Sequence, residues 1–183
     1  MAFHEELIHE DVRFPIIFHT DVVVPGNISG GAHWHRSLEI LCTLSGDGFT
    51  LIDGERIPMT AGDIVAIPSG SIHVTGTDKG ACRYYCLIID PDFLTAGGVW
   101  REHDRLPLSL RDPQAAALFE HINQEMTAQP VLYKEQVKVL VLQFIIGLRR
   151  GHPVENRAQS TGNEGSRIET VRKAIAAIDR EFE

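Results

Sequence analysis

The chain has 183 residues, of which 43% are hydrophobic and 23% are charged. These values are close to the globular average, which excludes a disordered or fibrous chain. The length favours one domain of roughly 150 residues with an appendage over two full domains. The 17 basic and 25 acidic side chains give a net charge of −8. This charge argues against a nucleic-acid surface within these residues, because phosphate binding needs clustered Lys and Arg.

Targeting signals and disulfides are not indicated either. The apolar runs are far shorter than the about 18 residues that cross a bilayer. The acidic start, residues 1–6, lacks the positive charge and apolar core of a secretory signal, so we expect a cytoplasmic protein. Cys42, Cys82 and Cys86 form an odd set without a Cys-x-x-Cys pair, which favours reduced core thiols.

Residues 12–89 consist of short runs rich in β-branched and aromatic residues, separated by turn sequences. Turn signals about every 8 to 12 residues predict an all-β sandwich or barrel, here of about eight strands. Within it, Asp53-Gly54 separates two apolar runs, 49–52 and 55–57. Asp followed by Gly suits positive φ angles, so these two residues predict a tight hairpin loop.

Two helices are predicted after the strands. Asp112 followed by Pro113 is an N-cap with a first-turn proline, and it predicts a helix over 113–128. A second helix spans roughly 132–150 and is closed by Gly151.

The second helix carries two apolar stripes. One contains Val137, Leu140, Val141, Phe144 and Leu148, and the other contains Val139, Leu142 and Ile146. A barrel covers only one stripe of a helix. The second stripe therefore predicts a homodimer in which helix 132–150 meets its symmetry mate across a twofold axis.

The last part of the chain is different in character. Residues 151–165 are polar and read as a flexible linker. Ser166 to Glu169 then form a capping box, followed by apolar residues three and four apart. One amphipathic helix over 166–183 cannot bury its own stripe. It therefore either docks back on the chain or opens a further domain.

Four side chains form a candidate ligand set. His33, His35 and Glu39 stand at i, i+2 and i+6, so on a continuous strand all three leave the same face. His73 follows the turn at 68–70, from which a neighbouring strand can present it to the same interior. Three imidazoles and a carboxylate suit Zn²⁺, Ni²⁺, Fe²⁺ or Mn²⁺, and the spacing does not select among them.

The same residues carry a family resemblance. Residues 33–46 resemble the first cupin motif and residues 62–73 resemble the second. The matching residues are His33-Trp34-His35, Glu39, Gly46, Gly62, Pro68-Ser69-Gly70 and His73. Asn27 stands where the motif has glycine, and Thr77 where it has asparagine. The resemblance implies a mostly β fold with C-terminal α structure, a cupin (double-stranded β-helix or jelly-roll) barrel.

Residues 39–48 and 61–73, more narrowly, resemble the effector-binding domain of AraC-type transcription regulators. The resemblance implies four parts: a cupin effector-binding domain at 1–105, a helical dimerisation segment at 106–150, a linker at 151–165, and the first helix of a helix-turn-helix DNA-binding domain at 166–183. The rest of that domain would lie beyond Glu183. The implied partners are a small-molecule effector, a sugar by family precedent, and DNA only through the missing domain.

The resemblance also implies a ligand pocket inside the barrel. His33, His35, Glu39 and His73 would line it with or without metal, since such regulators do not require the ion. His19 enters the set because an N-terminal arm can fold over effector in this family. Tyr84 and Tyr85 point to opposite sides of a strand, and we assign Tyr84 to the pocket, although the sequence alone does not decide between them. The opposite face of the motif strand is expected to pack under the helices: Trp34, Arg36, Leu38, Ile40, Cys42 and Leu44.

The sequence therefore favours a binding module without catalytic residues. The alternative is a stand-alone metal-dependent cupin enzyme, of dioxygenase or sugar-isomerase type, that uses the same four ligands. A polar linker followed by an unpaired amphipathic helix argues against the enzyme.

Overall fold

The structure, a computed structural model, describes residues 3–4, 13–101 and 104–152. The strands among these residues are β1 (Phe3–His4), β2 (Ile16–Val23), β3 (Ser29–Trp34), β4 (Leu38–Ser45), β5 (Asp47–Ile52), β6 (Glu55–Thr60), β7 (Ile64–Ile67), β8 (His73–Gly76), β9 (Cys82–Ile89) and β10 (Ser109–Leu110). The helices are α1 (Pro91–Ala96), α2 (Pro113–Ala128) and α3 (Tyr133–Gly151). The linker and last helix predicted from the sequence lie mostly or wholly outside the described residues.

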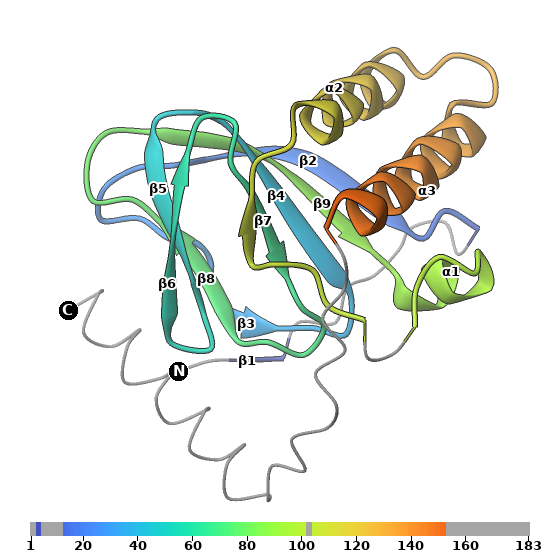
Figure 1. The fold of residues 1–183 in the computed structure, drawn as a ribbon. Helices are drawn as coiled ribbons and strands as arrows, with labels where there is room; N and C mark the ends of the chain where they lie inside the picture. The colour runs from blue at the N-terminus through green and yellow to red at the C-terminus, as the bar shows by residue number, and fades with distance from the viewer. Residues whose placement is uncertain (1–2, 5–12, 102–103, 153–183) are drawn as a thin grey trace, which may run out of the picture.

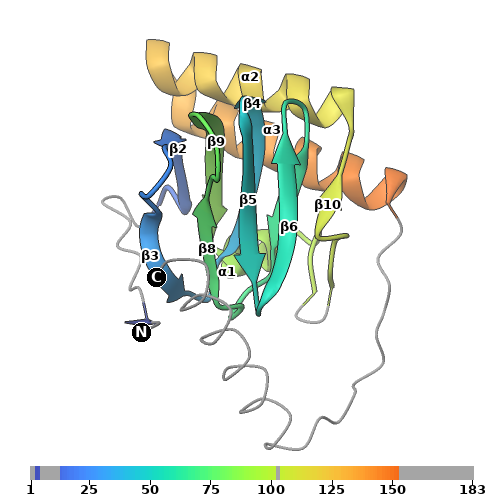
Figure 2. The same ribbon diagram turned by 90° about the vertical axis from the view of Figure 1, so that its left-hand side faces the viewer.

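The strands form two five-stranded sheets that face each other. Sheet A has the order β1-β3-β8-β5-β6, and sheet B has the order β10-β7-β4-β9-β2. The strand pairs are antiparallel except for β1 with β3. Sheet B lies between sheet A and the helices, with α2 and α3 side by side over its outer face (Figures 1 and 2). This architecture is the predicted cupin barrel followed by helices.

The central strand β4 shows why sheet B is buried on both faces. Leu38, Ile40 and Cys42 belong to the core shared with α2 and α3, whereas Leu41 belongs to the core inside the barrel. A strand covered on both faces reads as a nearly continuous apolar run, which is the sequence of β4. The prediction that these outward residues pack under the helices is therefore confirmed.

Two residues of that predicted set behave differently. Trp34 and Arg36 are exposed, so the prediction that they pack under the helices is wrong. The physical reason is a break in the strand, because Trp34 ends β3 in sheet A and Leu38 begins β4 in sheet B. Alternation of faces does not carry across a chain that changes sheets.

The two adjacent tyrosines of β9 point in opposite directions. Tyr84 is part of the core inside the barrel. Tyr85 lies under α2, where its hydroxyl donates to Oε2 of Glu120 at 2.7 Å. Burial and this carboxylate raise the pKa of Tyr85 to about 12. Tyr85 is therefore a structural link between sheet B and α2, and Tyr84 is the tyrosine on the barrel side.

The helices largely follow their sequence signals. α2 begins after Asp112, whose carboxylate accepts from the backbone N–H groups of Gln114 and Ala115, as predicted. α3 includes Gly151, which was predicted to lie just past its end. Helix α1 was not predicted, although Asp90 followed by Pro91 repeats the signal of α2 and caps the helix in the same way. None of the helices in the described residues is long and apolar enough to cross a membrane.

Two motif glycines, Gly46 at the end of the first motif and Gly62 at the start of the second, have different physical requirements. Gly46 and Gly62 both have positive φ, +78° and +87°. A Cβ at Gly46 would lie 1.9 Å from the backbone oxygen of Ala81, whereas a Cβ at Gly62 would meet nothing within 4 Å. Gly46 is therefore required both for its conformation and for space.

We expect Gly46→Ala to destabilise the domain more than Gly62→Ala. Gly62→Ala should cost about 1 kcal/mol for the left-handed conformation. Gly46→Ala adds a clash with the backbone of Ala81, just before β9, and should cost about 3 kcal/mol in total. Urea unfolding followed by circular dichroism measures both values, and equal losses in the two variants would contradict the steric argument.

Candidate metal centre

The four predicted ligand residues come from both sheets. His33 on β3 pairs in register with His73 on β8, so the two side chains lie on the same face of sheet A. Glu39 is the second residue of β4 in sheet B and lies opposite Ile67, a residue of the barrel core. The continuous strand that the sequence analysis assumed from His33 to Glu39 is therefore wrong. The residues converge because the chain crosses from one sheet to the other between them.

The two motif turns hold that crossing in place. The backbone N–H of Gly70 donates to the carbonyl of His35 at 2.8 Å. The hydroxyl of Ser69 donates to the carbonyl of Arg36 at 2.5 Å. The turn at 68–70 is thus bonded directly to the segment that carries His35. These bonds join the second motif to the first, as do the pairings of β3 with β8 and of β4 with β7.

The ligand atoms of His33, His35, Glu39 and His73 all lie within 4.8 Å of one another. The imidazole centroids of His33 and His73 are 4.3 Å apart, and those of His35 and His73 are 5.1 Å apart. His35 and His73 are each 2% exposed and Glu39 is 7% exposed, whereas His33 is partly exposed. The group is therefore a compact, buried set of nitrogen and oxygen donors that opens on the side of His33.

Backbone carbonyls orient all three imidazoles in the same sense. Nδ1 of His33 lies 2.9 Å from the oxygen of Gly31, and Nδ1 of His73 lies 2.9 Å from the oxygen of Ser71. Nδ1 of His35 lies 3.2 Å from the oxygen of Ser37. A carbonyl only accepts, so each Nδ1 is the donor. In the neutral imidazole this leaves Nε2 with its lone pair, the arrangement seen in histidines that bind metals.

The carboxylate of Glu39 meets two of these nitrogens. Its Oε2 lies 2.9 Å from Nε2 of His35 and 3.2 Å from Nε2 of His73. Burial raises the pKa of Glu39, but the hydrogen bonds and charges of His35 and His73 outweigh burial and hold the pKa well below its usual range. Glu39 is therefore an anion inside the barrel.

Proton counting shows what this anion requires. An imidazole that donates from Nδ1 approaches a carboxylate through Nε2 only if Nε2 carries a second proton or a cation lies between them. The set therefore calls for positive charge at its centre. Three imidazole nitrogens and one carboxylate oxygen match the donors preferred by divalent first-row metals and leave coordination positions open. The residues present thus fit a metal ion.

The other two candidate site residues lie apart from this set. His19 on β2 is exposed, pairs in register with Cys86, and has Nε2 3.2 Å from Oδ2 of Asp21. Tyr84 is fully buried in the barrel core. The structure therefore does not place either residue in the four-residue cluster.

Cys86 is a site residue that the sequence analysis missed. Its thiol donates to Oε1 of Glu39 at 3.5 Å. The two histidines contact the other carboxylate oxygen, Oε2. All three cysteines are free and buried. Alternation along β9 from Tyr84 is the one sequence signal that points to Cys86, because both face the barrel interior.

Comparison with known proteins identifies relatives of this domain. Residues 26–145 match the family model of the AraC-like ligand binding domain. An uncharacterised HTH-type transcriptional regulator, YdeC of Bacillus subtilis (strain 168), is 30% identical over 89 residues. That match covers 47% of this chain and 30% of the relative, so the chain spans about a third of the regulator's length.

Solved structures with a similar arrangement include cupins. A cupin 2 conserved barrel domain protein from Salinispora arenicola is 29% identical, with a TM-score of 0.41, over 50% of this chain and 77% of that one. A predicted oxalate decarboxylase from Thermotoga maritima is 28% identical, with a TM-score of 0.38, over 40% and 64% of the two chains. The family model covers well over half of the chain, and the chain therefore belongs to the family of AraC-like ligand-binding domains.

Proposed function

We propose that this chain is the effector-binding and dimerisation domain of an AraC-type transcription regulator. A small molecule in the barrel would control DNA binding by a domain beyond Glu183. The family match and the relation to an HTH-type regulator support this role. The observation that carries it is the buried set of three inward Nε2 atoms and one carboxylate. An effector acts by binding more tightly to one arrangement of the domain than to another.

The proposal includes one divalent ion held by His33, His35, Glu39 and His73. Zn²⁺, Ni²⁺, Fe²⁺ or Mn²⁺ would supply a Lewis-acid position for an oxygen of the effector. The backbone carbonyls that accept from Nδ1 would keep the imidazoles oriented, and Cys86 would hold the second oxygen of Glu39. The partly exposed His33 marks the side from which the effector enters.

His19 and Tyr84 are proposed as further effector contacts. His19 is exposed on β2, opposite Cys86 in the register, and Cys86 touches Glu39. Tyr84 lies on the barrel side of β9. Both residues therefore belong to strands that adjoin the four-residue set.

Removing two ligands should remove the metal. Protein purified without chelator is expected to hold about one equivalent of a first-row metal per chain, measured by elemental analysis. The double variant His35→Ala, His73→Ala should hold at least about tenfold less. His121→Ala, which changes an exposed histidine of α2, is the control and should hold as much as wild type. Equal metal in the double variant would contradict the site.

The cupin-enzyme alternative is tested with the same protein. In a binding domain, compounds that raise the melting temperature of the metal-loaded protein should be recovered unchanged by mass spectrometry after long incubation. Conversion of such a compound by wild type, lost in His35→Ala, His73→Ala, would favour the dioxygenase or isomerase reading.

Dimerisation is proposed to use the outer face of α3. Its inner stripe is buried against the barrel and α2: Val137, Leu140, Val141, Phe144 and Leu148. On the outer face Val139 is 56% exposed. Leu142 already packs against Gly97 of the same chain, because a Cβ at Gly97 would lie 2.9 Å from Cδ2 of Leu142. Val139 is therefore the better residue with which to test the seam.

Val139→Glu should weaken the dimer without unfolding the domain. A charge placed in an apolar seam is left unpaired, and we expect at least tenfold weaker association, about 1.4 kcal/mol. Analytical ultracentrifugation measures the association, and circular dichroism checks the fold. Thr127→Glu, at an exposed position of α2, is the matched control. A monomeric wild type at micromolar concentration, or a Val139→Glu variant as dimeric as the control, would contradict this interface.

DNA binding should require residues beyond Glu183. With a net charge of −8, residues 1–183 are expected to bind DNA weakly and without sequence preference. Electrophoretic mobility shift at several salt concentrations measures this. Sequence-specific, salt-sensitive binding by residues 1–183 alone would refute the division of roles.

A further inference from the structure

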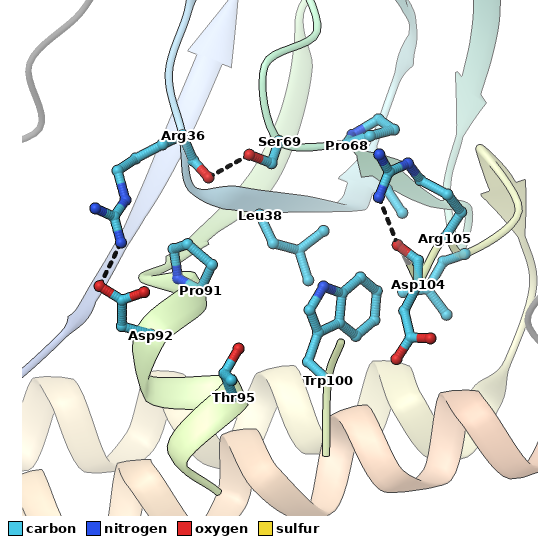
Figure 3. Close-up of a pocket in the computed structure, with 12 residues that line it drawn as sticks. Arg36, Leu38, Pro68, Ser69, Pro91, Asp92, Thr95, Trp100, Asp104 and Arg105 are labelled. Atoms are coloured by element: carbon cyan, nitrogen blue, oxygen red, sulfur yellow. Dashed lines mark hydrogen bonds and ion pairs between the residues drawn. The ribbon is translucent and has the colours of Figure 1, made fainter. Parts of the chain in front are cut away.

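A cavity of about 380 Å³ lies outside the barrel, between the outer face of sheet B, α1, Trp100 and residues 104–106 (Figure 3). Its volume falls within the range of small-molecule sites. It is separate from the four-residue set, because none of His33, His35, Glu39 and His73 lines it. Neither the proposed effector pocket nor the dimer seam uses it.

The inner lining of the cavity is apolar and aromatic. Leu38 on β4 and Ala66 on β7 form one wall, and Trp100 and Leu106 form another. All four side chains are buried within the core shared with the helices. In Figure 3, Leu38 and Trp100 occupy the middle of the cavity, between Arg36 on one side and Arg105 on the other. An indole beside aliphatic side chains is a surface on which a flat ring packs well.

The rim presents hydrogen-bond donors. Arg36 donates through Nη2 to Oδ2 of Asp92 at 2.5 Å, and Arg105 donates through Nη1 to the backbone oxygen of Asp104 at 2.8 Å. A guanidinium has five N–H donors and no acceptor, so one guanidinium can serve more than one acceptor. The same Nη2 of Arg36 lies 3.5 Å from Oδ1 of Asp90. The side chain of Asp92 is 82% exposed, and such exposed ion pairs exchange partners at little cost.

The buried acid of the cavity is already balanced. Asp104 is 3% exposed and its Oδ2 lies 3.0 Å from Nη2 of Arg149 on α3. The same oxygen accepts from the backbone N–H of Arg101 at 2.8 Å. Because Arg149 neutralises the carboxylate of Asp104, this carboxylate does not oppose an anion that enters between Arg36 and Arg105.

We propose that this cavity is a second ligand site, which binds a small aromatic carboxylate. The ring lies over Trp100 and Leu38, and the carboxylate accepts from the guanidinium of Arg36 or Arg105. An apolar floor with a few polar groups at the mouth is the usual composition of a small-molecule site. Arginine is suited to a carboxylate because its planar donors match the two oxygens.

The site lies where two functional parts of the domain meet. Leu38 and Glu39 are consecutive, so the cavity and the candidate metal centre lie on opposite faces of β4. Arg36 is joined through its carbonyl to Ser69. Asp104 is joined to Arg149, in the last turn of α3. A ligand here contacts both the turn of the metal centre and the residues that anchor α3.

The test uses 2-naphthoate as probe and its neutral amide, 2-naphthamide, as a matched compound. Titration calorimetry of metal-free protein should show one 2-naphthoate per chain in the micromolar range, and at least tenfold weaker binding of 2-naphthamide. Thr95→Trp, at the exposed edge of the cavity on α1, should weaken 2-naphthoate at least tenfold by filling the space. Thr127→Trp on α2 carries the same change far from the cavity and should bind as wild type.

A second variant separates charge from space. Arg36→Gln with Arg105→Gln should weaken 2-naphthoate at least tenfold and leave 2-naphthamide unchanged. Thermal unfolding of each variant shows whether it is folded. The proposal is overturned if 2-naphthoate binds Thr95→Trp and Thr127→Trp equally, if the arginine variant binds it as wild type does, or if wild type shows no binding. Because metal-free protein is used, these outcomes do not depend on the metal centre or the effector role.

Discussion

The negative charge of Glu39 inside the barrel is the constraint on which the rest of the site depends. A buried carboxylate is costly unless positive charge and hydrogen bonds meet it. Here His35 and His73 meet one oxygen and the thiol of Cys86 meets the other. Glu39 lies on β4, and these partners come from β8, β9 and the turn between β3 and β4. The charge of one residue therefore requires both sheets to be correctly placed.

The crossing between the sheets has consequences on both faces of β4. The bonds of Gly70 to His35 and of Ser69 to Arg36 hold the motif turns together. On the inner face they bring the ligands into one cluster. On the outer face Leu38 lines the cavity beside α1. The two sites share strand β4, although different residues line them.

The helical layer connects these sites to the proposed dimer seam. Tyr85 joins sheet B to α2 through Glu120, and Phe119 on α2 packs edge to face against Phe144 on α3, with ring centroids 5.1 Å apart. Arg149 then ties the end of α3 to Asp104 beside the cavity. Close-packed elements transmit small displacements because protein interiors have low compressibility. In the proposed regulator, this layer would link the bound ligand to the dimer seam and the linker.

The sequence by itself determined the all-β character of residues 12–89, the hairpin at Asp53-Gly54 and the start of α2, because turn chemistry and helix caps are local. It also singled out the four residues of the cluster. Tertiary structure decided how they meet, since the change of sheet after Trp34 breaks the alternation of faces that the sequence analysis assumed. It also decided the inward direction of each Nε2, the role of Cys86 and the outer cavity. Those features depend on contacts between segments far apart in the chain, which no local pattern encodes.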